Sequence, residues 1–230
     1  MRTTALLAAL ALAALLLACG GSDKDAAGGE TSDGQLAAMT LALEELGPAY
    51  DAFELDDDSG FRSNEEAAEE ANDKEDERSD IERFGRINGF ETIYISTPAF
   101  MSGKGPWMVS AVVDLFQDAE GASGSLWDDV DDWKREVGRT VGQVTLSDAQ
   151  EFDPGDIGDE TTGVVATVTL TGNEASPFRM TAVAFRRGPL VGTVGIARFD
   201  EEDVSGEVIA LAQKLDERIQ SALGGEMRTP

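Results

Sequence analysis

Residues 178–199 read FRMTAVAFRRGPLVGTVGIARF, and this stretch decides the fold. Both halves are rich in Val, Thr and Phe, which favour β-strands. The sequence therefore predicts strands at 178–187 and 190–199. The link Arg187-Gly188-Pro189 is very short, and parallel strands need a long crossover, so the two strands are expected to form an antiparallel hairpin.

Four segments before this hairpin also have the composition of strands, at 90–96, 107–116, 141–146 and 164–171. In the second of them, WMVSAVVDLF, alternation predicts one apolar face. That face consists of Trp107, Val109, Ala111, Val113 and Leu115.

Apolar spacing predicts helices at 36–46, 126–137 and 204–219, and Gly224-Gly225 is expected to end the last one. On the middle helix Trp133 falls on the core stripe, whereas Asp128, Asp131 and Asp132 fall on the opposite side and are expected to face water. The order of elements predicts an α+β domain: a largely antiparallel sheet of about six strands with amphipathic helices packed on it.

The N-terminus has the pattern of a secretion signal. Met1 and Arg2 precede the apolar run Ala5–Leu17, which spans about 20 Å as a helix, short of the roughly 30 Å hydrocarbon core. The following residues, Leu16-Leu17-Ala18-Cys19, resemble the lipobox of bacterial membrane lipoproteins. The resemblance implies cleavage before Cys19, a diacylglycerol on its thiol, and a third acyl chain such as palmitate on its new amino group.

The sequence thus predicts three parts: a lipoprotein signal peptide at 1–18, a lipidated flexible tether at 19–34, and a single α+β domain at 35–225. The tether is predicted because its Gly, Ala, Ser and Asp offer no large apolar side chain to offset the entropy of ordering. The domain contains an acidic excursion at about 54–83, which fits a solvated helix or a mobile segment equally well. Cys19 is the only cysteine, so no disulfide is available.

Composition excludes several classes of function. A formal net charge of -27 would repel nucleic acid and anionic lipid, so the expected membrane contact is through the acyl chains on Cys19. The chain has no His, which removes the commonest general base and imidazole-bound metals. The segment Ser102-Gly103-Lys104-Gly105 lacks the residues of a phosphate-binding loop. We therefore expect no enzyme activity and no cofactor.

The acidic residues leave calcium binding open as one possibility, with a solvated acidic face as the other. The segment LDDDSG at 55–60 fails as an EF-hand loop because Leu55 stands where an acid is required. A calcium site of another kind could use either of two groups of side chains. The first is Asp56, Asp57 and Asp58, and the second is Asp153, Asp156, Asp159 and Glu160.

Three further residues are candidates for ligand binding. Arg186 and Arg187 form a basic pair in an acidic chain, which fits either an anion site or ion pairs with neighbouring carboxylates. Trp127 lies about 100° from the centre of the apolar stripe of its helix, where it could border a pocket or an interface.

Three short segments resemble small actinobacterial-type lipoproteins and sensor-like domains of PsbP-like fold. They are Phe84-Gly85-Arg86, Gly158-Asp159-Glu160 and Phe185-Arg186-Arg187-Gly188. The resemblance spans about 36–223 and implies an extracytoplasmic binding or accessory role. The resulting hypothesis is a lipid-anchored binding or sensory domain without catalytic activity, on the outer face of a bacterial membrane, for a small molecule or an envelope protein. Its alternatives are an accessory subunit of a cell-envelope complex and an acidic calcium-binding envelope protein. Whether the membrane is the inner or the outer one is left open.

Overall fold

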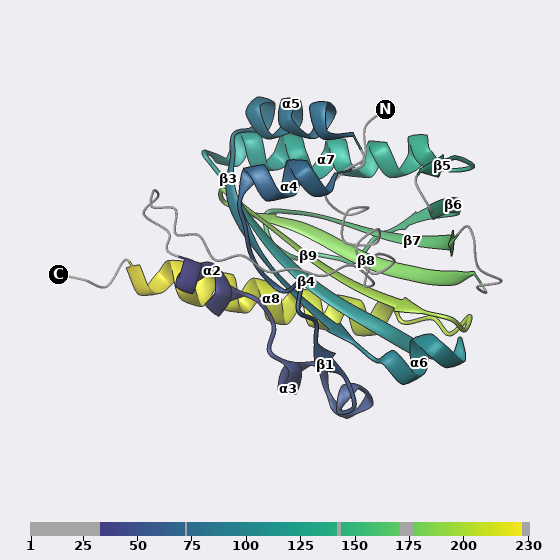
Figure 1. Ribbon diagram of the computed structural model, residues 1–230. Coiled ribbons are helices and arrows are strands. Elements are labelled where there is room, and N and C mark those ends of the chain that lie inside the picture. The colour runs from purple at the N-terminus through teal and green to yellow at the C-terminus, as the bar shows by residue number, and fades with distance from the viewer. Residues whose placement is uncertain (1–32, 72, 142–143, 171–176, 227–230) are drawn as a thin grey trace.

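The computed structural model describes residues 33–71, 73–141, 144–170 and 177–226. Its centre is one antiparallel sheet in the order β1-β3-β4-β9-β8-β7-β6-β5, with β2 also paired to β3 (Figure 1). The α+β class and the antiparallel sheet are confirmed. The strands are β1 (Glu54–Leu55), β2 (Gly60–Arg62), β3 (Arg86–Ile95), β4 (Pro106–Phe116), β5 (Thr140–Val141), β6 (Val144–Phe152), β7 (Glu160–Leu170), β8 (Phe178–Arg187) and β9 (Leu190–Arg198).

The hairpin predicted at 178–199 forms as β8 and β9, with Arg187 opposite Leu190. The six expected strands correspond to β3, β4 and β6–β9. The sheet also includes β1, β2 and β5, each only two or three residues long, which is too short to show an alternating pattern. Strands β1–β4 and β5–β9 form two parts of the sheet that meet where β4 pairs with β9.

Helices cover both faces of the sheet. The C-terminal helix α8 (Ser205–Glu226) lies on one face, with α2 (Asp33–Met39) beside it, while α4 (Asn64–Glu70), α5 (Lys74–Phe84) and α7 (Ala119–Glu136) lie on the other (Figure 1). Short helices α3 (Leu43–Leu46), η1 (Pro48–Tyr50) and α6 (Thr97–Ser102) complete the described elements. None of the helices in the described ranges is long and apolar enough to cross a membrane.

All three predicted helices have different bounds in the structure, and α7 begins at Ala119 where the start was predicted at 126. The expected helix at 36–46 is divided into α2 and α3, because the chain leaves the helical conformation between Met39 and Leu43. The expected stop at Gly224-Gly225 is wrong, since α8 continues through both glycines to Glu226. The acidic excursion contains ordered elements, α4 and α5, which pack against the sheet and α7.

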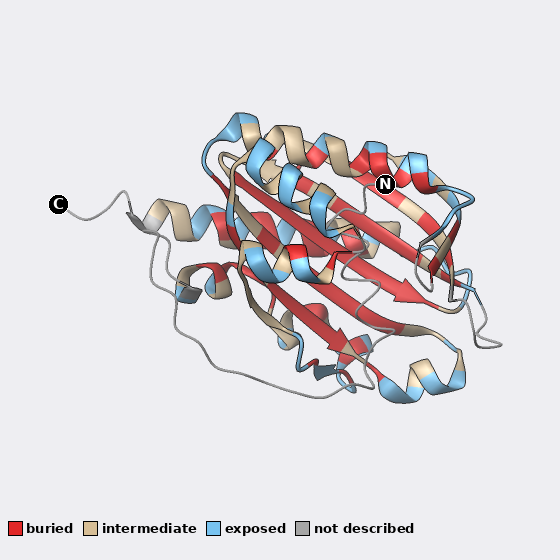
Figure 2. Ribbon diagram, turned by 45° about the horizontal axis from the view of Figure 1, so that its top comes forward, coloured by how far each residue is buried: buried red, intermediate tan, exposed pale blue. Residues whose placement is uncertain are grey.

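Apolar clusters lie on both faces of the sheet, and its central strands are mostly buried between the helical layers (Figure 2). The core beneath α8 contains Val109, Ala111 and Val113 of β4, as predicted. Trp107 does not join them. A register shift between Pro106 and Met108 interrupts the alternation, and Trp107 packs in the other core, 5.4 Å from the ring of Phe178.

Candidate functional site

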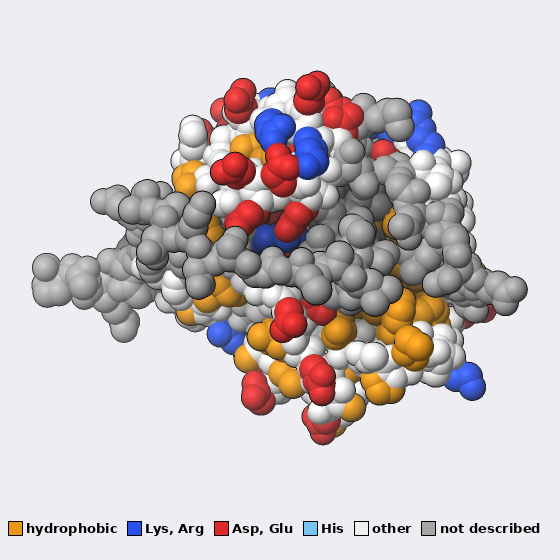
Figure 3. All heavy atoms as spheres, viewed as in Figure 1, with side chains coloured by type: hydrophobic (Ala, Val, Ile, Leu, Met, Phe, Trp, Pro, Cys, Tyr) orange, Lys and Arg blue, Asp and Glu red, His pale blue; other side chains and the backbone are white. Residues whose placement is uncertain are grey.

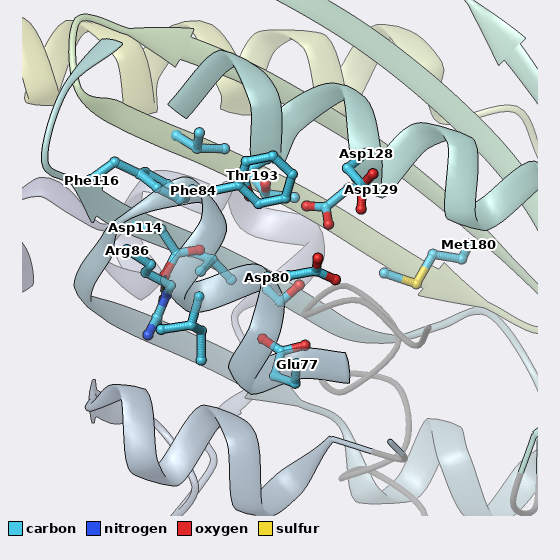
Figure 4. A pocket seen from close by; sticks show the side chains of 15 residues that line it. Glu77, Asp80, Phe84, Arg86, Asp114, Phe116, Asp128, Asp129, Met180 and Thr193 are labelled. Carbon is cyan, nitrogen blue, oxygen red and sulfur yellow. Dashed lines mark hydrogen bonds and ion pairs between the residues drawn. The ribbon is translucent and has the colours of Figure 1, made fainter. Parts of the chain in front are cut away.

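A cavity of about 60 Å³ lies between the sheet and the helices α5 and α7 (Figure 4). Its floor comes from β4, β8 and β9, which meet at the centre of the sheet, and its roof comes from the two helices. The floor contributes Ser110, Asp114, Phe116 and Thr193, and the roof contributes Glu77, Asp80, Phe84, Asp128 and Asp129.

The gap beneath the roof is set by close contact between α5 and α7. Helix α5 ends at Gly85, whose left-handed backbone (φ 68°) caps the last turn, so Phe84 lies directly against α7. A Cβ at Gly121 would come 2.0 Å from the carbonyl oxygen of Phe84, and one at Gly124 would come 2.8 Å from its ring. The two glycines therefore allow a helix contact that any larger residue would push apart.

Two hydroxyl groups on the floor have no hydrogen-bond partner among the described residues. Ser110 of β4 and Thr193 of β9 are 4% and 7% exposed, and both side chains line the cavity. Neither hydroxyl oxygen is among the fully buried side-chain atoms that lack a partner, so both are within reach of a molecule in the cavity. Their position at the cavity indicates that something occupying it, water or a ligand, bonds to them.

Carboxylates surround the same space, and Figure 4 shows those of Glu77, Asp80 and Asp129 turned toward it from two helices. The guanidinium of Arg86, which also lines the cavity, is held by Asp114, with N···O distances of 2.7 and 2.9 Å. Its Nη1 donates to Asn64 at 2.8 Å. Arg86, the one basic residue among the described residues that line the cavity, is therefore already engaged.

The remaining carboxylates differ in their partners. Asp128 has Arg83 at 3.6 Å, outside the cavity. The carboxylates of Glu77 and Asp129 have neither a hydrogen bond nor an ion pair within 4.0 Å in the described ranges. They are the two acidic groups of the cavity whose charge lacks a direct counterion.

This environment favours the protonated forms. Burial, with the charges of Asp114 and Asp80 adding to it, raises the pKa of Glu77 to about 7 despite the opposing effect of Arg86. Burial also raises the pKa of Asp129 well above its usual range, and the neighbouring charges of Glu77 and Asp114 reinforce the effect. A cation entering the cavity would reverse both effects.

The structure corrects the expectation that Asp128, Asp131 and Asp132 all face water. The side chain of Asp131 is 69% exposed, but that of Asp128 is 16% exposed and lines the cavity. Asp132 is fully buried, where it contacts Arg135. The three side chains differ in exposure because α5 and the sheet pack against α7 and cover more of its surface than the apolar stripe alone.

The candidate ligand-binding residues lie outside the cavity. Trp127, 42% exposed, donates from Nε1 to Glu160 at 2.7 Å, and Arg186 donates from Nε to the same carboxylate at 2.9 Å. Arg187 extends to the other face of the sheet and pairs with Asp216 at 2.7 Å. The structure thus brings Trp127 and Arg186 together through Glu160, and links Arg187 to Arg186 through Asp159.

The hydrogen bonds from Ser123, Trp127 and Arg186 lower the pKa of Glu160, although burial acts in the opposite direction. These contacts correspond to the alternative in which the arginines pair with neighbouring carboxylates. Asp159 takes part as well, accepting from Arg186 at 2.9 Å and from Arg187 at 3.3 Å.

The calcium candidates occupy two separate places. Asp56, Asp57 and Asp58 lie in the turn between β1 and β2, where Asp56 accepts a bond from the backbone N–H of Asp58 at 3.0 Å. Asp156 lies in the loop before β7, whereas Asp159 and Glu160 bind the arginines. Within the described ranges, no three acidic side chains are arranged to hold a metal ion.

The residues of the cavity were absent from the sequence-based candidates. Glu77 and Asp80 stand in the acidic excursion, and Ser110 and Thr193 stand inside strands, where a single hydroxyl has no distinctive pattern. One signal was available for Asp129: it lies about 60° from Leu126 on the helix, at the border of the apolar stripe.

No protein-family model matches this chain, and no curated protein matches it in sequence. Among solved structures, the extracellular domain of PknH from Mycobacterium tuberculosis has a similar fold, with a TM-score of 0.51 and 14% sequence identity. The match covers 81% of this chain and 96% of that domain. At this identity the likeness shows a shared fold, and the resemblance to PsbP-like domains stays a prediction.

Proposed function

We propose that this chain is a lipid-anchored extracytoplasmic domain that binds a small molecule in the cavity between the sheet and α5 and α7, in a sensory or binding role without catalysis. The observation that carries the proposal is a pair of hydroxyls on two largely buried residues, Ser110 and Thr193, which line the cavity and have no hydrogen-bond partner among the described residues. A cavity with apolar walls and a few convergent polar groups is the usual form of a ligand site.

The location rests on two supports. The signal-like N-terminus with Leu16-Leu17-Ala18-Cys19 supports export and lipidation, although these residues lie outside the part of the chain that the structure describes. The shared fold of the PknH extracellular domain agrees with a place outside the cytoplasm. Acyl chains on Cys19 would hold the protein at the membrane, since two or more chains together give stable anchoring.

Chemical features of the cavity support binding without reaction. Neither Ser110 nor Thr193 has a base within hydrogen-bonding distance among the described residues, so neither hydroxyl is activated as a nucleophile. The cavity has a volume of about 60 Å³, which suits a molecule of a few non-hydrogen atoms.

Native mass spectrometry of the protein extracted gently from its own membranes tests this proposal. We expect the mass of the chain from Cys19 plus acyl groups, together with a small additional mass that survives extraction. A Cys19→Ser variant should lose the acyl mass and leave the membrane fraction. A chain that retains Met1 would contradict lipidation, a co-isolated polypeptide would favour the accessory-subunit alternative, and calcium-sized increments would favour the calcium alternative.

In the accessory alternative, a protein partner would bind an exposed apolar surface, and Figure 3 shows one on the face that it draws. Hydrophobic side chains gather over the region of α6 and β1, whereas charged side chains dominate over α4 and α5 (Figure 3). Met101 of α6 is 78% exposed and Leu55 of β1 is 57% exposed. A polypeptide recovered with the protein should therefore be lost in a Met101→Ser variant if it binds there.

A further inference from the structure

We propose that the ligand of the cavity is a short aliphatic primary amine, bound as its ammonium ion, with Glu77, Asp129, Ser110 and Thr193 around the nitrogen. This inference rests on the proposed function and names the chemical class of the ligand. It follows from the charge, the hydrogen-bonding capacity and the size of the cavity.

The carboxylates of the cavity favour a cation. The carboxylates of Glu77, Asp80, Asp114, Asp128 and Asp129 line the cavity. Arg86, the one basic residue in the part of its lining that the structure describes, is engaged by Asp114 and Asn64. An anion in the cavity would be repelled by these carboxylates. A cation placed between Glu77 and Asp129 would supply the counterion that both carboxylates lack among the described residues, in an environment where such pairing is only weakly screened by water.

The hydrogen-bonding groups select an ammonium ion among cations. A primary ammonium has three N–H donors and no acceptor, so it matches carboxylates and hydroxyl oxygens. A quaternary ammonium has no donor and would leave Ser110 and Thr193 unpaired. A metal ion needs several oxygens converging at short distance, and the described side chains form no such group.

The walls and the volume limit the rest of the molecule. Phe84, Phe116 and Val191 give the cavity an apolar lining that suits methylene groups. The volume of about 60 Å³ corresponds to roughly four to six water-sized positions, and hence to a molecule with about that number of non-hydrogen atoms. A straight-chain amine of three to five carbons has this size.

The test uses four probes of nearly equal size: n-butylammonium, 1-butanol, tetramethylammonium and butyrate. Each is titrated into the full mature chain at pH 7.5 and low salt, and binding is followed by calorimetry and by amide chemical shifts. We expect n-butylammonium to shift amides of β4, β9, α5 and α7. The other three probes should bind at least tenfold more weakly or not at all.

Variants locate the binding. Asp129→Asn should weaken n-butylammonium binding tenfold or more, and Thr193→Val three- to tenfold. Asp131→Asn, which removes an exposed carboxylate from the same helix, should leave it unchanged and serves as the matched control. Thermal unfolding of each variant checks the fold, and if Asp129→Asn does not fold, Thr193→Val decides.

The outcomes separate this inference from the proposed function. If 1-butanol or tetramethylammonium shifts the cavity amides as strongly as n-butylammonium, the cavity binds ligands but the assignment to a primary amine is wrong. The same holds if Asp129→Asn and Thr193→Val bind n-butylammonium unchanged. If no probe shifts the cavity amides and membrane extraction yields no small molecule, the proposed function fails as well.

Discussion

Neutralising Glu77 should stabilise the protein at alkaline pH and have little effect at acid pH. Its carboxyl lies in the cavity, where burial raises its pKa to about 7 from 4.5, with Asp114, Asp80 and Asp129 nearby and Arg86 acting in the opposite direction. The folded state therefore holds this proton to higher pH than the unfolded chain does. The stability that the proton contributes is full below pH 4.5 and is lost as the pH rises to about 7.

The magnitude follows from linkage. Each pH unit between the two pKa values is worth about 1.36 kcal/mol, so ionisation of Glu77 costs roughly 3 kcal/mol of folding free energy once the pH exceeds 7. Gln has nearly the same shape and never ionises. Relative to its own effect at pH 4.5, Glu77→Gln should therefore gain roughly 3 kcal/mol at pH 8.

Urea unfolding at pH 4.5, 6 and 8 measures this gain. Glu75→Gln is the matched control, because Glu75 is exposed on the first turn of the same helix. Its unfolding midpoint should follow that of the unaltered protein. If the midpoints of Glu77→Gln and the unaltered protein move in parallel across the three pH values, the assignment of a raised pKa to this carboxyl is wrong.

Three further predictions concern the frame around the site. Gly121→Ala should destabilise the protein by about 2 kcal/mol, because its Cβ would meet the Phe84 carbonyl oxygen at 2.0 Å. Gly206→Ala should not destabilise it, because nothing lies within 4 Å of the added Cβ, and urea unfolding compares the two variants. Arg62→Gln leaves the buried carboxylate of Glu91, 3.1 Å from the Arg62 guanidinium, without its cation, so it should lower the free energy of unfolding by about 3 kcal/mol at pH 8. At pH 5 the loss should be smaller, because burial raises the pKa of Glu91 to about 7 and its carboxyl takes up a proton. Equal losses at both pH values would contradict this. Tyr94→Phe removes the hydrogen bond that the Tyr94 hydroxyl donates to the Leu41 carbonyl at 3.0 Å and should cost about 1 kcal/mol in the same assay; an unchanged midpoint would show that this bond contributes nothing.

The sequence was informative wherever side chains repeat with the period of a strand or helix. The hairpin at 178–199 and the stripe of Leu126, Val130 and Trp133 were predicted because burial of one face dictates such repeats. Trp107 was misplaced because a local shift in register leaves no mark on an alternating pattern.

The site was harder to predict because its residues come from three regions and share no motif. Thr193 and Ser110 are remote in sequence and become neighbours only through the pairing of β4 with β9. Glu77 belongs to a segment whose acidity suggested solvent exposure, and only its packing over the sheet places it in the cavity. A carboxylate count cannot distinguish this arrangement from a solvated surface.

The pairing of β4 with β9 has a consequence for how the protein folds. Strands β6–β9 follow one another as neighbours, so they can form from local contacts, whereas β4 and β9 are separated by about a third of the chain and must pair late or slowly. Ser110 and Thr193 stand on opposite sides of this junction. The cavity therefore does not exist before this pairing forms, and a molecule bound there would hold the two parts of the sheet together.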